Sequence, residues 1–144
     1  MAIGWPVRTA DCGMRLTSMD DWRFLLSSRA NVLLEGPDRA IERAVSVLSP
    51  HLRSPIQMCP HWAPQEVARE GTLILRDLET LSAREQQNLL FWLDDAGEQI
   101  QVISLSTTPL FRRVLEGDFL DALYYRLNVL YIPADDALSI GAAD

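Results

Sequence analysis

The chain has 144 residues, of which 48% are hydrophobic and 23% charged, so its length and composition are those of one globular domain with its own core. Twenty acidic residues against thirteen basic ones give a net charge of −7, which argues against a protein that binds nucleic acid backbones. All thirteen basic residues are arginine, and the absence of lysine excludes a P-loop lysine, a Schiff base and the lysine of a receiver domain.

Periodicity and capping signals predict that the chain begins with a helix, a strand and a second helix. The first helix is expected over about 18–29, where Ser18 and Asp21 are placed to form a capping box. The apolar run 30–35 predicts a buried strand, because it is short, continuous and followed by a Gly-Pro pair. Pro37 then suits the first turn of the second helix.

The middle of the chain predicts two strands and a long helix. A weaker strand is expected over 55–59, followed by a proline-punctuated loop over 60–70. The apolar run 71–77 predicts a clear buried strand. Ser82 and Glu85 have the spacing of a second capping box, and the apolar residues behind them recur at helical intervals.

The last part of the chain continues the alternation of strands and helices. Residues 100–105 predict a strand, 109–116 and 119–127 predict two helices, and 129–132 predict a final strand. Strands this apolar, with helices between them, imply a parallel sheet that is covered on both faces. The sequence therefore predicts an α/β fold.

The turn after the first predicted strand does not fit the common nucleotide-binding patterns. It holds one glycine, Gly36, whereas a dinucleotide fold needs G-x-G-x-x-G, and it lacks both the length and the lysine of a P-loop. A helix N-terminus follows the turn, and such an end favours anions. However, Glu35 and Asp38 place negative charge where phosphates would lie.

The segment 117–128, GDFLDALYYRLN, closely resembles the G-x-F-R-x-D-L-Y-Y-R-L-N signature of sigma-54-dependent transcription activators, the bacterial enhancer-binding AAA+ proteins. With this register, 30–36 resembles the strand before their Walker A loop, 71–93 their Walker B strand and the helix after it, and 101–108 their sensor strand. The resemblance covers about 31–132. It implies a P-loop NTPase-like (AAA+) three-layer sandwich with a parallel five-stranded sheet.

The departures from the family concern the nucleotide site. Its remnants are Gly36, Pro37, Asp38, Arg76, Asp77 and Thr107. Gly36, Pro37 and Asp38 are all that is left of the phosphate loop. Arg76 and Asp77 replace the Walker B Asp-Glu pair, and Thr107 replaces the sensor asparagine. Arg76 puts a cation where the family has its magnesium ligand, and a buried ion pair between Arg76 and Asp77 would close that site. The resemblance therefore implies that the ATPase is lost, with no catalytic residue and with neither ATP nor magnesium as a cofactor.

One interface feature of the family is kept. Of the two arginines that the family directs at a neighbouring subunit's nucleotide, the first is matched by Leu120 and the second by Arg126. Arg126 is therefore a candidate trans-acting arginine, with Phe119, Tyr124 and Tyr125 beside it on the candidate interface. The alternative for Arg126 is an ordinary surface arginine at the end of a helix. For the two tyrosines, packing is favoured over ligand stacking.

Other parts of the family are expected to be missing. The loop 60–70 replaces an insertion whose tip contacts the sigma factor, so no sigma-contacting loop is expected. The chain ends past the last core strand, so the helical lid and the DNA-binding helix-turn-helix are also expected to be absent. We therefore expect a single degenerate AAA+ core over 1–133 and a flexible acidic tail over 134–144.

Residues outside the family motifs add little chemistry. Cys59, His51 and His61 do not have the spacing of a metal site. Trp62 is either an anchor for a partner or, as favoured, a loop aromatic folded onto the core. Residues 1–13 lack the apolar core of a signal peptide, and no uncharged stretch is long enough to span a membrane. A cytoplasmic protein is expected.

The sequence thus predicts an inactive AAA+ domain that acts in transcription regulation through protein–protein interaction. Its partner would be an AAA+ activator or a second copy, without direct DNA binding. One alternative is a residual ATP-binding regulatory module, whose phosphate site would use arginines such as Arg39 and Arg43. Another is a structural adaptor domain unrelated to transcription.

Overall fold

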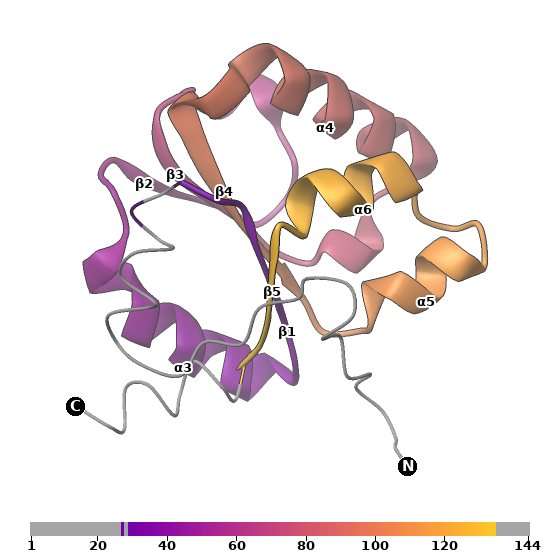
Figure 1. Ribbon diagram of the computed structural model, residues 1–144, viewed down its shortest axis with the longest axis horizontal. Helices are drawn as coiled ribbons and strands as arrows, with labels where there is room; N and C mark the ends of the chain where they lie inside the picture. Colours follow the sequence, from indigo (N-terminus) through magenta and orange to yellow (C-terminus); the bar gives the residue numbers. More distant parts are fainter. Residues whose placement is uncertain (1–26, 28, 135–144) are drawn as a thin grey trace.

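The computed structural model describes residue 27 and residues 29–134. Figure 1 shows strands at the centre with helices on both sides. In chain order these elements are β1 (Val32–Glu35), α3 (Asp38–Leu48), β2 (Ile56–Cys59), β3 (Gly71–Leu75), α4 (Ala83–Ala96), β4 (Ile100–Ser106), α5 (Leu110–Leu115), α6 (Asp121–Leu127) and β5 (Leu130–Pro133). Short 3-10 turns lie between them at η1 (Ser49–His51), η2 (Pro64–Glu66), η3 (Leu78–Thr80) and η4 (Gly97–Gln99). The helix predicted over 18–29 lies outside the described residues except for 27 and 29, and the predicted tail over 134–144 does so except for 134.

The five strands form one parallel sheet in the order β2-β3-β4-β1-β5. The central strand β1 pairs with β4 on one side and with β5 on the other, so that Val32 lies between Ile103 and Leu130. Each predicted strand is present, and its ends agree within two residues. The predicted α/β fold with a parallel five-stranded sheet is confirmed.

Two apolar clusters, one on each face of the sheet, form the core. On one face, α3 packs Ile41, Ala44 and Leu48 against strand residues that include Val32. On the other face, α4 and α6 cover a cluster that includes Leu33. Neighbouring strand residues enter different clusters because side chains alternate between the two faces of a sheet. Figure 1 shows the corresponding layers, with α3 on one side of the strands and α4 and α6 on the other.

The long helix α4 begins at the predicted capping box. The Ser82 hydroxyl accepts a hydrogen bond from the Glu85 N–H (3.1 Å), and the Glu85 carboxylate accepts one from the Ser82 N–H (2.9 Å). This bond from the backbone of Ser82 is the main reason that the pKa of Glu85 lies below its ordinary value. The helix ends at Gly97, whose φ of +68° is a left-handed conformation that favours glycine.

Two glycines with nearly the same positive φ provide a test of the packing at the start of β3. A Cβ on Gly71 (φ +81°) would lie 2.2 Å from the carbonyl oxygen of Pro55, whereas nothing lies within 4 Å of a Cβ on Gly117 (φ +83°). We expect Gly117→Ala to lower the free energy of unfolding by about 1 kcal/mol, the cost of a left-handed alanine. Gly71→Ala should lower it by about 3 kcal/mol or more, because the backbone at Pro55 must also move. Urea denaturation followed by circular dichroism measures both, and equal losses would contradict the predicted clash.

Candidate functional site

The remnant residues follow the carboxyl ends of three neighbouring strands. Gly36 follows β1, Arg76 follows β3 and Thr107 lies directly after β4. These strands are adjacent in the order β3-β4-β1, so the three segments share one edge of the sheet. The carboxyl edge of a parallel sheet is where α/β folds bind their ligands. The fold therefore brings the remnants of the predicted nucleotide site together at the expected place.

The turn from β1 to α3 is closed by contacts within the protein. Gly36 is buried, and its N–H donates to the carbonyl oxygen of Ser106 (3.2 Å) at the end of β4. A Cβ on Gly36 would lie 3.0 Å from the Cβ of Ala134, so the turn is also packed against the end of β5. Pro37 caps α3 without a side-chain hydrogen bond and has no N–H, and Asp38 is exposed in the first helical turn. The Gly36 amide is thus committed to Ser106 rather than directed at a ligand.

The carboxylate of Glu35 is buried beside this turn, with 3% of the residue exposed. One of its oxygens accepts a hydrogen bond from the N–H of Leu110 (2.9 Å), at the start of α5. The other accepts one from the hydroxyl of Tyr131 (2.9 Å), on β5. We call these three residues the Glu35 network. The sequence places the negative charge of Glu35 at the phosphate position, but gives no signal that the carboxylate is held by two donors from the following elements.

Arg76, which the sequence predicts to replace the magnesium ligand, pairs with α3. Its guanidinium lies 4.0 Å from the carboxylate of Glu42, and its backbone N–H donates to the carbonyl oxygen of Cys59 (3.1 Å). The predicted ion pair between Arg76 and Asp77 is wrong. Asp77 has a left-handed backbone (φ 54°) that begins η3, and its carbonyl oxygen accepts hydrogen bonds from the N–H and the hydroxyl of Thr80. The long Arg76 side chain reaches α3 instead.

Thr107, at the sensor position, donates its hydroxyl hydrogen bond to Glu79 of η3 (2.6 Å). No motif in the sequence marks Glu79. The other carboxylate oxygen of Glu79 is buried and has no hydrogen-bond partner among the described residues. The sensor hydroxyl is therefore engaged by a neighbouring turn of the same chain.

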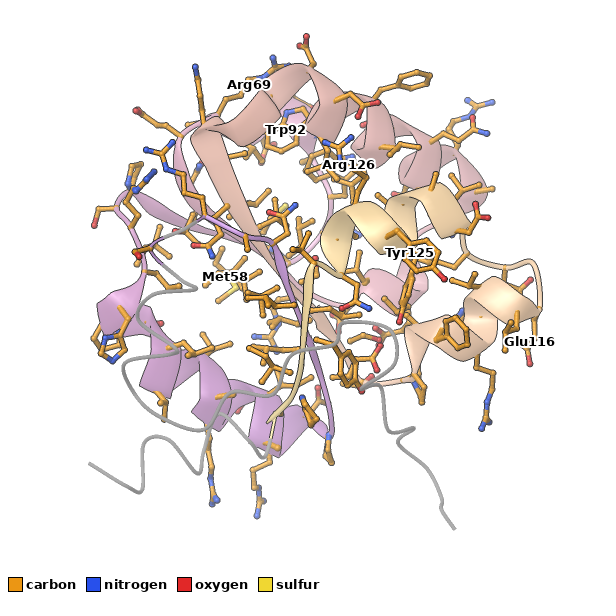
Figure 2. The ribbon with its side chains drawn as sticks, in the orientation of Figure 1. Met58, Arg69, Trp92, Glu116, Tyr125 and Arg126 are labelled. Carbon is orange, nitrogen blue, oxygen red and sulfur yellow. The ribbon has the colours of Figure 1, made fainter. Side chains whose placement is uncertain are left out.

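The predicted interface residues do not form one exposed set. Phe119 and Tyr124 are buried in the core on the α4 side of the sheet, so their assignment to an accessible interface is wrong. Tyr124 lies on the face of α6 that packs into this cluster. Tyr125 is exposed, and Arg126 pairs with Asp94 of α4 while 41% of its side chain stays exposed. Figure 2 shows Arg126 on the side of α6 that is nearer α4 and Tyr125 on the other side.

Trp62 is buried, stacks edge-to-face on Trp92 with ring centroids 5.3 Å apart, and donates its indole N–H to Asn88 (2.7 Å), which confirms that it folds onto the core. Arg39 and Arg43 are exposed on α3. Within the described ranges, no group of His, Cys, Asp and Glu side chains is placed to hold a metal ion, and no helix is long and apolar enough to cross a bilayer.

Comparisons with known proteins give a family and a fold. A family model described as Sigma-54 interaction domain matches residues 40–134, more than half of the chain. NtrX from Brucella abortus in complex with ATP has a TM-score of 0.59 and 17% identity, over 84% of this chain and 36% of its own. The P-loop NTPase domain of a sigma-54 transport activator from E. coli has a TM-score of 0.53 and 17% identity, over 74% of this chain and 98% of its own. A search of curated protein sequences found no match.

The matches to solved structures establish the fold. A DNA polymerase III gamma subunit-related protein from Thermotoga maritima also matches, with a TM-score of 0.52 and 17% identity over 81% of this chain and 45% of its own. The sheet order and these likenesses together identify a P-loop NTPase-like AAA+ core. The chain spans little more than a third of the length of the NtrX structures that it matches.

ATP and magnesium, which the AAA+ fold implies, do not fit the residues at this edge of the sheet. The chain has no lysine to neutralise phosphates, and the Gly36 amide is bonded to Ser106. The Glu35 carboxylate lies next to the turn, where it would repel a phosphate. Arg76 presents a cation in place of an oxygen ligand for the metal.

The Glu35 network gives a testable stability prediction. Glu35→Leu should lower the free energy of unfolding by about 3 kcal/mol, because the Leu110 N–H and the Tyr131 hydroxyl lose a buried acceptor. Glu35→Gln should cost about 1 kcal/mol, since an amide has one acceptor for Leu110 and one donor for the Tyr131 oxygen. Chemical denaturation of both variants provides the measurement. A Glu35→Leu variant as stable as Glu35→Gln would show that the network contributes no stability.

Proposed function

The chain belongs to the sigma-54 interaction domain family, and we propose that it is an inactive cytoplasmic member that regulates transcription by binding another protein, an AAA+ activator. The observation that carries this proposal is the closed turn between β1 and α3. Its buried Gly36 amide is bonded to Ser106, and the neighbouring Glu35 carboxylate is bonded to Leu110 and Tyr131. A site whose donors and acceptors are satisfied within the protein is not preorganised for phosphates.

The loss of catalysis follows from how phosphoryl transfer is accelerated. That chemistry depends almost entirely on positioning the phosphates and neutralising their charge. Here the lysine is missing from the chain, the magnesium ligand is replaced by Arg76, and the sensor hydroxyl of Thr107 is bonded to Glu79. Each change removes a separate contribution to the rate, so their combination supports a domain without ATPase activity.

The surface around Arg126 is the candidate docking site for the activator. Its ion pair with Asp94 is largely exposed on both sides, and such pairs contribute about 0–1 kcal/mol. A partner that offers a carboxylate or a bound nucleotide can therefore take over the guanidinium at little cost. The neighbouring Tyr125 is exposed and supplies an aromatic contact of the kind that is enriched at interfaces.

Nucleotide titration tests the inactive state. We expect no heat of binding when the purified protein is titrated with ATP or ADP at millimolar concentration, with or without magnesium. An active sigma-54 activator domain, treated identically, serves as the positive control. Binding in the micromolar range would contradict the proposal and favour a nucleotide-sensing module.

A charge reversal tests the docking surface. Arg126→Glu should weaken binding to the AAA+ domain of a sigma-54 activator by about tenfold or more, because it reverses the charge at the contact. Arg112→Glu makes the same charge change on an exposed arginine of α5 and should leave binding unchanged. Surface plasmon resonance with the immobilised activator domain measures both. Equal binding by the wild type and Arg126→Glu would exclude this surface.

A further inference from the structure

The outer face of α4 carries a row of exposed side chains that is not used by the candidate nucleotide site. Arg84, Asn88, Phe91 and Asp95 are exposed and follow each other at intervals of four, three and four residues. This spacing places them on one line along the helix. We call these four residues the α4 row. Phe91 is the most exposed large apolar residue of the described chain, with 73% of its surface accessible.

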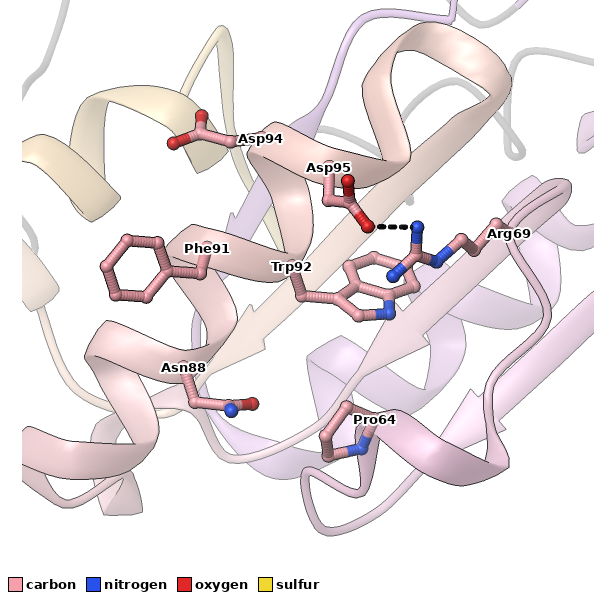
Figure 3. Close-up of a pocket in the computed structure, with 7 residues that line it drawn as sticks. All are labelled: Pro64, Arg69, Asn88, Phe91, Trp92, Asp94 and Asp95. Carbon is pink, nitrogen blue, oxygen red and sulfur yellow. Dashed lines mark hydrogen bonds and ion pairs between the residues drawn. The ribbon is translucent and has the colours of Figure 1, made fainter.

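A hollow of about 580 Å³ lies beside this row. Its walls include Pro64 of η2, Arg69, and the indole of Trp92, which is mostly buried. Arg69 lies over the Trp92 ring, 5.9 Å from its centroid, and pairs with Asp95. Figure 3 shows Phe91 pointing away from Arg69 and Pro64, with Trp92 between them. The exposed ring of Phe91 therefore lies on the side of α4 away from Arg69 and Pro64.

The α4 row is complementary to the same row of a second copy whose helix runs antiparallel to it. A twofold axis midway between Leu89 and Leu90 brings Arg84 of one copy opposite Asp95 of the other, and Phe91 opposite Asn88. An interface of two identical chains about a twofold axis requires such reciprocal matching. In this arrangement the Phe91 rings of the two copies lie on the same side of the helix pair and close to the axis, because residue 91 is near its centre. The two rings can therefore pack against each other across the axis.

Charge also favours a second copy at this surface. The chain carries a net charge of −7, so two copies repel each other over most approaches. The α4 row itself carries one positive and one negative side chain, Arg84 and Asp95, so it adds no net charge to this repulsion. Asp95 already bonds Arg69, but a carboxylate accepts several hydrogen bonds and has capacity for a second arginine.

We infer that the α4 row is a self-association surface, on which a second copy of this chain docks antiparallel. The inference deepens the proposed role in protein binding by adding a second copy as a partner. Self-association does not depend on the closed turn between β1 and α3 or on the activator. Sedimentation of the isolated chain therefore tests this inference, and the titrations described above test the proposed function independently. One helix face forms a small interface, and weak association in the micromolar range is expected.

Sedimentation velocity of the full chain over a concentration series tests this inference. The wild type should change from monomer to dimer as its concentration rises from micromolar to millimolar. Phe91→Ala should weaken the dimer by about tenfold or more, because it removes a central aromatic anchor. Leu115→Ala is the matched control, since Leu115 is 71% exposed on α5 and lies outside the α4 row. A monomer at every concentration, or equal effects of both variants, would overturn the inference.

Mixing two charge variants tests the antiparallel register. Arg84→Glu and Asp95→Arg should each fail to dimerise alone, because each places like charges at both ends of the twofold contact. Mixed together, they should form a heterodimer, because every Arg–acid contact across the axis is restored. Asp95→Arg removes the partner of Arg69 both alone and in the mixture, so dimerisation that appears only in the mixture reports the contacts across the axis. A mixture that remains monomeric would exclude this arrangement.

Discussion

The carboxylate of Glu35 lies buried at the end of the central strand, where it accepts hydrogen bonds from the start of α5 and from β5. A buried charge is costly unless donors compensate it. Here the backbone N–H of Leu110 and the hydroxyl of Tyr131 provide that compensation, and both belong to elements that follow β4. Together with the pairing of β5 and β1, these contacts connect the last third of the fold to the end of β1. They also place a buried carboxyl group beside the turn between β1 and α3.

The stability of the fold and the candidate nucleotide site depend on different residues. The two apolar clusters lie along the faces of the sheet, whereas Gly36, Arg76 and Thr107 lie at one edge. Burial of apolar surface within the clusters is the main favourable term in folding. Residues at this edge can therefore change without loss of the sheet.

The sequence predicted the elements well because their signals are local. Apolar runs marked the strands, and Ser82 with Glu85 marked the start of α4. The site was predicted less well because its partners are distant in the chain. Glu35 bonds residues 75 and 96 positions away, and no local pattern indicates such contacts. The burial of Phe119 and Tyr124 likewise depends on how α6 rests on α4, while the motif that contains them suggested an interface.

The C-terminal end of α4 contributes to both proposed binding surfaces, the one around Arg126 and the α4 row. Asp94 and Asp95 lie in the last turn of the helix, where carboxylates are unfavourable next to the negative end of the helix dipole. Each is compensated by an arginine from another segment, Asp94 by Arg126 of α6 and Asp95 by Arg69 before β3. Both ion pairs are exposed and therefore weak, so either arginine can be exchanged for one from a partner. The same two carboxylates thus contribute little to holding α4 in the domain and belong to the two surfaces proposed to bind other chains.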